Sequence, residues 1–237
     1  MRRAPSRTPA GLAGLLLALG ACGAVGAPAA ETSVKPGINE SFLAPDLAVD
    51  PFIQRFEAES REIARAAGAI AAFCGLAPGA VIADVGAGTG LFEPLFDQAV
   101  GPEGKVYAVE ISAPFLAHLA ARDAAEGWRN VELVACTERS VALPARSVDV
   151  VFICDTYHHF EYPQSTLASI RRALRPGGLL VVVDFERIEG VSSAWLLDHV
   201  RAGKDVFRAE IETAGFRFLD EPEVPGLEEN YVLRFRR

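Results

Sequence analysis

The chain has 237 residues, of which 50% are hydrophobic, 23% charged and 8% aromatic. This composition excludes a wholly disordered chain and a collagen-like repeat, and the length suits one domain with short appendages. The net charge is −8, from 23 basic and 31 acidic residues, and the chain has no long basic run, so nucleic acid is not an expected partner.

The first 21 residues have the layout of a bacterial export signal. Three arginines precede an apolar stretch over 11–26, which is shorter than the ~20 residues that a membrane-spanning helix needs. Leu19-Gly20-Ala21-Cys22 resembles a lipobox, which would lipidate Cys22 and tether the protein to a membrane. We expect a lipoprotein signal peptide over 1–21 and a protein of the cell envelope. The alternatives are another cleavage site, an uncleaved anchor, or a misassigned start codon and a cytoplasmic protein.

Residues 22–51 are expected to form a flexible tether, because this stretch is rich in Ala, Pro, Gly and Ser. The remaining chain, 52–237, is expected to fold as one domain. It begins with a helical periodicity over 53–73, and Leu76-Ala77-Pro78-Gly79 ends the predicted helix.

Short apolar strands then alternate with helices. Strands are predicted over 80–85, 105–110, 131–136, 148–154, 179–185, 216–219 and 231–235. Helices are predicted over 91–100, from a cap at Ser112 to Gly127, from Pro163 to Arg175, and over 195–214. This alternation predicts an α/β fold, a Rossmann-like doubly wound and mostly parallel sheet with helices on both faces. Such sheets bind ligands beyond the carboxyl ends of their strands.

A glycine-rich turn with an acidic partner predicts a nucleoside-bearing cofactor. The first strand ends in Asp84-Val85-Gly86-Ala87-Gly88-Thr89-Gly90, and Glu110 ends the next strand. A carboxylate at that place can accept hydrogen bonds from ribose hydroxyls. The third glycine comes one residue earlier than in the dinucleotide fingerprint G-x-G-x-x-G, which disfavours NAD.

This turn resembles motif I of the class I S-adenosylmethionine-dependent methyltransferases, and Glu110, Asp155 and Leu174-Arg175-Pro176-Gly177-Gly178 strengthen the resemblance to that family. The resemblance covers 52–237 and is strongest to the group that includes the ubiquinone and menaquinone biosynthesis enzymes, in a bacterial branch with Asp-x-Tyr-His-His. It implies a seven-stranded sheet with an antiparallel last strand, and S-adenosyl-L-methionine as cofactor. It also implies cofactor contacts at Asp84, Gly86, Gly88, Gly90, Glu110, Thr137, Glu138 and Asp155.

The segment Asp155-Thr156-Tyr157-His158-His159 is expected to border the transferable methyl group. We predict that Tyr157 and His158 line the acceptor pocket, and that His158 or His159 orients or deprotonates a small-molecule acceptor. Adjacent residues of a regular chain point in different directions, so at most one of the histidines is expected to face the cofactor. The alternative is that both are pocket walls that transfer no proton.

Three further groups of residues allow more than one interpretation. A metal site of Asp155, Asp184 and one histidine is conceivable, but Phe185 stands where a further ligand would follow, so no metal is predicted. Trp195, His199 and Ala202 recur at helical spacing and either cap the acceptor pocket or pack in the core. Three cysteines in apolar surroundings are expected to be buried thiols: Cys74, Cys136 and Cys154.

These observations predict a methyltransferase that acts on an unidentified small molecule. Two other functions remain open: an exported binding module that keeps the fold without catalysis, and an NAD-dependent oxidoreductase.

Overall fold

The computed structural model describes Met1, residues 31–58 and residues 61–237. The predicted signal peptide over 1–21 and the predicted lipidation site at Cys22 lie outside the described residues. Residues 31–237 form one compact unit. Within the described ranges, no helix combines the length and the apolar character needed to cross a membrane.

Seven strands form one sheet in the order β3-β2-β1-β4-β5-β7-β6. Their bounds are β1 Val81–Val85, β2 Lys105–Glu110, β3 Val131–Ala135, β4 Val148–Cys154, β5 Leu174–Phe185, β6 Arg217–Asp220 and β7 Asn230–Arg236. All neighbours pair in parallel except β7, which runs antiparallel between β5 and β6. The predicted doubly wound sheet with an antiparallel last strand is therefore confirmed. Its strand order reverses between β1 and β4, where such sheets open a crevice for ligands.

The strand β4 shows why this sheet is buried on both faces. Val151 and Ile153 belong to the hydrophobic cluster on one face, and Val150 and Phe152 belong to the cluster on the other. This is the period of two that a pleated strand imposes on its side chains. Both clusters are covered by helices, so every position of the strand can be apolar.

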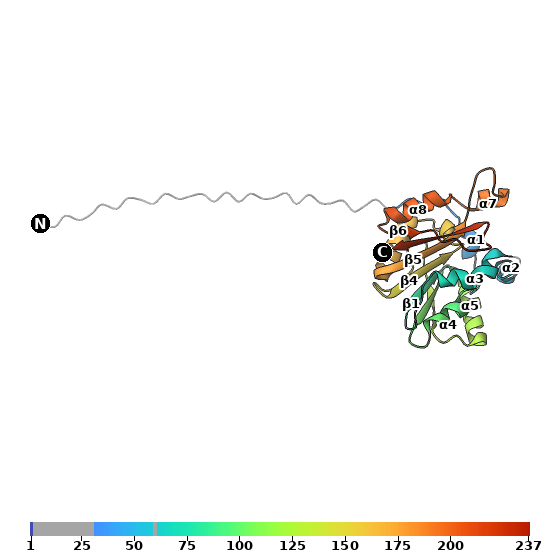
Figure 1. The fold of residues 1–237 in the computed structure, drawn as a ribbon, viewed down its shortest axis with the longest axis horizontal. Coiled ribbons are helices and arrows are strands. Elements are labelled where there is room, and N and C mark those ends of the chain that lie inside the picture. Colours follow the sequence, from blue (N-terminus) through green and yellow to red (C-terminus); the bar gives the residue numbers. More distant parts are fainter. Residues whose placement is uncertain (2–30, 59–60) are drawn as a thin grey trace. The chain divides into compact units, whose positions relative to one another are not determined.

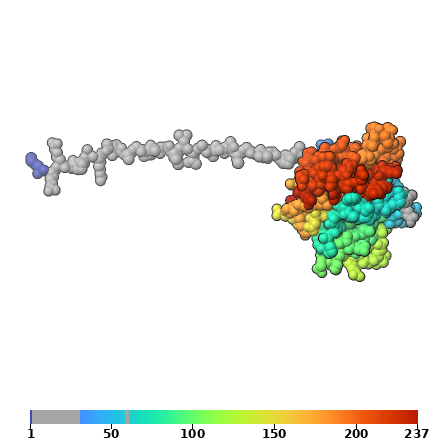
Figure 2. Space-filling view, in the orientation of Figure 1, coloured from blue at the N-terminus to red at the C-terminus, as the bar shows by residue number. Residues whose placement is uncertain are grey.

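The helices are α1 Glu40–Leu43, α2 Asp50–Phe56, α3 Glu62–Ala72, α4 Glu93–Val100, α5 Ala113–Glu126, α6 Pro163–Ala173, α7 Ala194–His199 and α8 Lys204–Thr213, with a 3-10 turn η1 at Tyr157–His159. Ser112 occupies the predicted cap position of α5, but its hydroxyl makes no capping bond. Figure 1 shows α1, α2 and α7 gathered at one end of the sheet. Figure 2 shows the α3 segment beside the C-terminal strands, where the Glu62 carboxylate accepts the backbone N–H groups of Glu228 and Glu229.

Two predicted helices are each broken in the structure. The helix expected over 53–73 is interrupted before α3, because Arg61 has an extended backbone with ψ at 128°. The helix expected over 195–214 is interrupted between α7 and α8, because Val200 is extended with ψ at 118° and Gly203 caps α8. Helical periodicity alone reveals neither break.

Most of the predicted tether is built into the domain. The Glu31 carboxylate accepts the backbone N–H groups of Gln164 and Ser165, at 2.8 and 2.7 Å, in the first turn of α6. The Asn39 side chain is only 6% exposed and donates a hydrogen bond of 3.1 Å to the His159 carbonyl. Residues 31–51 therefore belong to the fold. Their partners lie more than 100 positions away in sequence, so composition gave no sign of them.

Glu31→Ala should lower the free energy of unfolding by about 1–2 kcal/mol, because a helix N-terminus loses a charged cap that satisfies two backbone donors. Urea unfolding measures this change. Glu40→Ala, on the exposed side of α1, is the matched control and should change stability by less than about 0.5 kcal/mol. Equal stability of the two variants would mean that the segment is a tether after all.

Candidate functional site at the carboxyl ends of the strands

A cavity of about 760 Å³ lies at the carboxyl ends of the parallel strands. Its walls come from the glycine turn after β1, from the segments that follow β2, β3 and β4, and from α2, α3, η1 and α7. This volume lies within the range of small-molecule and cofactor sites. The sequence placed the site at this edge of the sheet, and the structure has a cavity there.

The glycine turn forms one wall of the cavity. Gly86 and Gly88 both line it and have φ values of +83° and +56°, which other residues rarely adopt. A Cβ on Gly86 would lie 2.3 Å from the Thr156 side chain, so no larger residue fits there. The turn can therefore bring its backbone close to a ligand.

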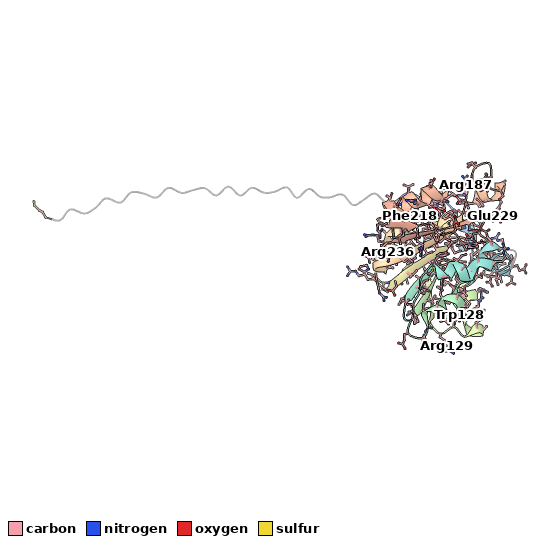
Figure 3. The ribbon with its side chains drawn as sticks, in the orientation of Figure 1. Trp128, Arg129, Arg187, Phe218, Glu229 and Arg236 are labelled. Atoms are coloured by element: carbon pink, nitrogen blue, oxygen red, sulfur yellow. The ribbon has the colours of Figure 1, made fainter. Side chains whose placement is uncertain are left out.

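Gly90 is not part of the cavity wall, contrary to its predicted cofactor contact. A Cβ at this position would lie 2.9 Å from Leu119 and 3.2 Å from Trp128. Leu119 belongs to α5, and Trp128, labelled in Figure 3, follows that helix. The third glycine therefore lets α5 pack closely against the turn.

The Glu110 carboxylate borders the cavity beside the turn. It is 5% exposed and accepts backbone N–H groups from Gly88 at 2.9 Å, Ile111 at 2.7 Å and Ser112 at 2.8 Å. Burial raises the pKa of Glu110, and the three N–H donors oppose that effect by stabilising the charge. The carboxylate is thus fixed in the cavity wall, and its contact with a ribose stays a prediction.

Asp84 and Glu93 form a buried carboxyl pair next to the turn. Their side chains are 3% and 0% exposed, and only Asp84 lines the cavity. Burial, followed by the charge of Glu93, raises the pKa of Asp84 well above its usual value. Burial also raises the pKa of Glu93 to about 7. Both carboxyl groups therefore keep a proton to a higher pH than exposed carboxyl groups do.

Asp155 connects three segments at the end of β4. Its carboxylate pairs with the Arg61 guanidinium, and it accepts a hydrogen bond of 2.6 Å from the Asn230 side chain. Burial raises the pKa of Asp155 to about 6, and the charge of Arg61 opposes that rise. Arg61 stands at the break before α3, and all three residues line the cavity.

Thr137 and Glu138 line the cavity beyond the end of β3, next to the place of Glu110. Burial and the nearby charge of Glu161 raise the pKa of Glu138. The Glu138 carbonyl accepts a hydrogen bond of 2.9 Å from the Thr166 hydroxyl, which ties this segment to α6. Both residues therefore lie in the cavity wall, and their contact with an adenine stays a prediction.

Tyr157 lies in the core and not in the cavity wall, so its predicted place in the acceptor pocket is wrong. It is 0% exposed, and its ring packs 5.0 Å from those of Phe160 and Phe207. Its hydroxyl donates a hydrogen bond of 2.9 Å to Glu210 on α8. The first residue of η1 therefore points to the opposite side from the two histidines.

Both adjacent histidines line the cavity, and the expectation that at most one of them faces the cofactor stays a prediction. The chain turns at η1, and the two rings tilt toward each other with centroids 4.3 Å apart. Asp184 fixes the first ring: its carboxylate lies 2.8 Å from His158 Nδ1 and also accepts the His158 backbone N–H at 3.0 Å. Asp184 is fully buried outside the cavity wall, so it does not form the conceivable metal pair with Asp155.

A third histidine completes this part of the wall. The His199 ring lies 4.9 and 5.0 Å from the rings of His158 and His159, and it stacks on Trp195 at 4.8 Å. Ala202 follows the break after α7 and is not in the wall. We name the histidine end of the cavity by its lining side chains: Phe42, His158, His159, Phe185, Trp195 and His199.

His159 and His199 are held in the neutral form. Burial, followed by the charge of His158, lowers the pKa of His159 to about 2 and that of His199 to about 4. A neutral imidazole has a free lone pair on one ring nitrogen.

Sequence reasoning missed wall residues that come from the segment expected to be a tether. Asn39 and Phe42 line the cavity, and the Phe42 ring lies 5.0 Å from that of His159. The apolar Phe42 within a stretch of small and polar residues was the available signal.

Of the three cysteines expected to be buried, only Cys74 is fully buried, whereas Cys136 and Cys154 are half-buried and line the cavity. Burial raises the pKa of Cys136 to about 12 and moves the pKa values of Cys74 and Cys154 in the same direction. All three are free of disulfides.

Tyr157→Phe should leave cofactor affinity unchanged within about threefold, because the hydroxyl faces away from the cavity. The loss of one buried hydrogen bond should lower the free energy of unfolding by about 1 kcal/mol. Urea unfolding and ligand titration of the same sample measure both effects. A large loss of ligand affinity without a loss of stability would mean that Tyr157 belongs to the site after all.

Glu93→Gln should make stability less dependent on pH. Because the pKa of Glu93 is raised from 4.5 to about 7, its stabilising contribution is complete below pH 4.5 and is lost as the pH rises through 7. The loss is on the order of 3 kcal/mol between those limits. Urea unfolding from about pH 5 to about pH 8 should show a smaller decrease for the variant than for the natural chain. The same decrease in both would refute the raised pKa of Glu93, and exposed Glu132→Gln serves as control.

The methyltransferase domain family matches residues 83–182. The ubiquinone/menaquinone biosynthesis C-methyltransferase UbiE of Hahella chejuensis is 32% identical over 114 residues, which are 48% of this chain and 46% of that protein. The chain thus spans about half the length of the curated relatives it matches.

Solved structures share more of the fold. A S-adenosylmethionine-dependent methyltransferase from Aquifex aeolicus has a TM-score of 0.70 and 25% identity, covering 78% of this chain and 97% of that one. The [4+2]-cyclase SpnF has a TM-score of 0.67 and 17% identity, covering 89% and 97%. This chain therefore has the fold of the class I S-adenosylmethionine-dependent methyltransferases, and its residues 83–182 match the methyltransferase domain family.

Proposed function

We propose that this protein transfers the methyl group of S-adenosylmethionine to a small-molecule acceptor. The observation that carries the proposal is one continuous cavity with two chemically different ends. At one end the glycine turn lies beside Asp84, Glu110 and Asp155, and the other is the histidine end. Methyl transfer needs the cofactor and the acceptor in line within one site, since the acceptor atom attacks the methyl group directly.

The acidic end suits the cofactor in charge and in shape. S-adenosylmethionine carries a sulfonium and an ammonium group, and carboxylates attract both. Glu110 is already fixed by three backbone donors, so it can receive ribose hydroxyls with little rearrangement. Gly86 and Gly88 leave room for the rest of the cofactor to approach the backbone.

The histidine end suits an acceptor that is apolar with a small polar group. Phe42, Phe185 and Trp195 offer aromatic surface, and three imidazoles supply polar atoms. Small-molecule sites combine mostly apolar walls with a few directed polar groups in this way.

The competing functions make different demands on the glycine turn. An NAD-dependent oxidoreductase would need the third glycine of its fingerprint near the pyrophosphate, whereas Gly90 here packs against α5. A binding module without catalysis would keep the fold but not a cofactor pocket. The cyclase among the structural relatives shows that the fold alone does not define the reaction, so cofactor binding is the first property to test.

Calorimetric titration of the full chain with S-adenosylmethionine, S-adenosylhomocysteine and NAD tests the proposal. We expect micromolar affinity for the first two and none for NAD. Glu110→Ala should weaken that affinity about 10-fold to 100-fold, the value of a hydrogen bond to a charged group. Glu132→Ala, which removes an exposed carboxylate on β3, should bind like the natural chain.

If NAD alone binds, the protein is better explained as an NAD-dependent oxidoreductase. If none of the three ligands binds, the protein is better explained as a binding module without catalysis. Equal loss of affinity in Glu110→Ala and Glu132→Ala would mean that Glu110 does not contact the cofactor and that the cofactor binds elsewhere.

A further inference from the structure

Three imidazoles meet at the histidine end from two separate segments. His158 and His159 come from η1, and His199 comes from the end of α7. One ring nitrogen of each lies within 4.8 Å of one ring nitrogen of the other two. Side chains so placed either bind a shared ligand or leave polar atoms without partners.

Two of these nitrogens are buried and have no hydrogen-bond partner among the described residues: His158 Nε2 and His159 Nδ1. The His158 side chain is only 1% exposed. A buried polar atom without a partner costs about 1–3 kcal/mol, so native structures rarely keep one without a purpose. Both atoms belong to rings that form the cavity wall, so a ligand in the cavity can reach them.

The protein holds the His158 and His199 rings in place. The Asp184 carboxylate fixes His158 through Nδ1 at 2.8 Å. Trp195 stacks on His199 with an angle of 18° between the ring planes. A carboxylate behind a histidine, with the far nitrogen left free, is the usual support of a metal-binding imidazole.

We propose that His158, His159 and His199 bind one divalent transition-metal ion, with Zn²⁺ as the best fit. Three imidazole ligands suit zinc, copper and nickel better than magnesium or calcium, which prefer oxygen. Three protein ligands leave the fourth position of a tetrahedral ion open, as in catalytic zinc sites. Here that position faces the cavity, since all three rings line it.

Metal binding requires only a small closure of the cluster. Zinc–nitrogen bonds of ~2.0–2.1 Å in a tetrahedral site place ligand nitrogens about 3.4 Å apart. The observed separations of up to 4.8 Å therefore need side-chain shifts on the order of 1 Å. His199 can supply much of this shift, because it ends a six-residue helix and lies on the cavity wall.

The open position defines the class of acceptor, and this step rests on the proposed function. An acceptor with a hydroxyl oxygen would coordinate there and release its proton to water. The oxygen then forms a bond to the methyl carbon while the carbon–sulfur bond breaks and its electron pair stays on sulfur. The products are a methylated oxygen and neutral S-adenosylhomocysteine.

The test uses the untagged full chain, freed of metal with a chelator, and two probes, Zn²⁺ and Co²⁺. We expect one equivalent of zinc after loading and gel filtration, measured by elemental analysis. Cobalt should give visible absorption without the near-ultraviolet band of a thiolate ligand. His199→Ala changes a residue outside the buried core and should weaken zinc affinity at least about 100-fold.

Two further variants separate a ligand from a general effect on folding. His118→Ala removes the chain's fourth histidine, which lies on α5 and not in the cavity wall, and should bind zinc like the natural chain. Asp184→Asn changes a positioning residue and should weaken zinc affinity about 10-fold to 100-fold.

Three outcomes would overturn the inference: no stoichiometric zinc in the natural chain, unchanged zinc affinity in His199→Ala, or a thiolate band with cobalt. Titration with S-adenosylmethionine on the same metal-free sample keeps the two proposals apart. Cofactor binding without zinc binding would refute the metal site and leave the methyltransferase proposal intact.

Discussion

The cavity depends on the buried carboxylate of Asp155, which joins parts of the chain that are far apart in sequence. Through Arg61 it holds the break before α3, and through Asn230 it holds the start of β7. It does so from the end of β4, where its own φ of +47° turns the chain toward η1. A charge this deeply buried is costly unless it is paired, so loss of Arg61 would leave an unpaired carboxylate in the cavity wall.

Regular elements of the fold were predictable because their signals are local. The strands β2 and β4 begin and end where the sequence places them, since each is an apolar run between turn residues. The glycine turn and Glu110 were predictable for the same reason. The breaks at Arg61 and Val200 were not, because extended backbone at those residues is set by tertiary contacts that override helical periodicity.

The residues that η1 and α7 bring to the cavity were harder to predict than those at the strand ends. Residues at strand ends, such as Glu110 and Asp155, are placed by topology alone. The direction of Tyr157 and His159 depends on a three-residue turn, whose geometry no periodic pattern describes. His199 reaches the cavity only because α7 ends early, so an unbroken helix gave no reason to group it with the other two histidines.

The ordered segment over 31–51 also limits how far the domain can lie from Cys22. Because Glu31 is fixed on α6, only nine peptide steps separate it from Cys22. A fully extended chain gains at most about 3.6 Å per residue, so those steps reach about 30 Å. A lipid on Cys22 would therefore keep the domain within about one bilayer thickness of the membrane surface. A protein held so close would meet acceptors concentrated at that surface in preference to those dilute in bulk water.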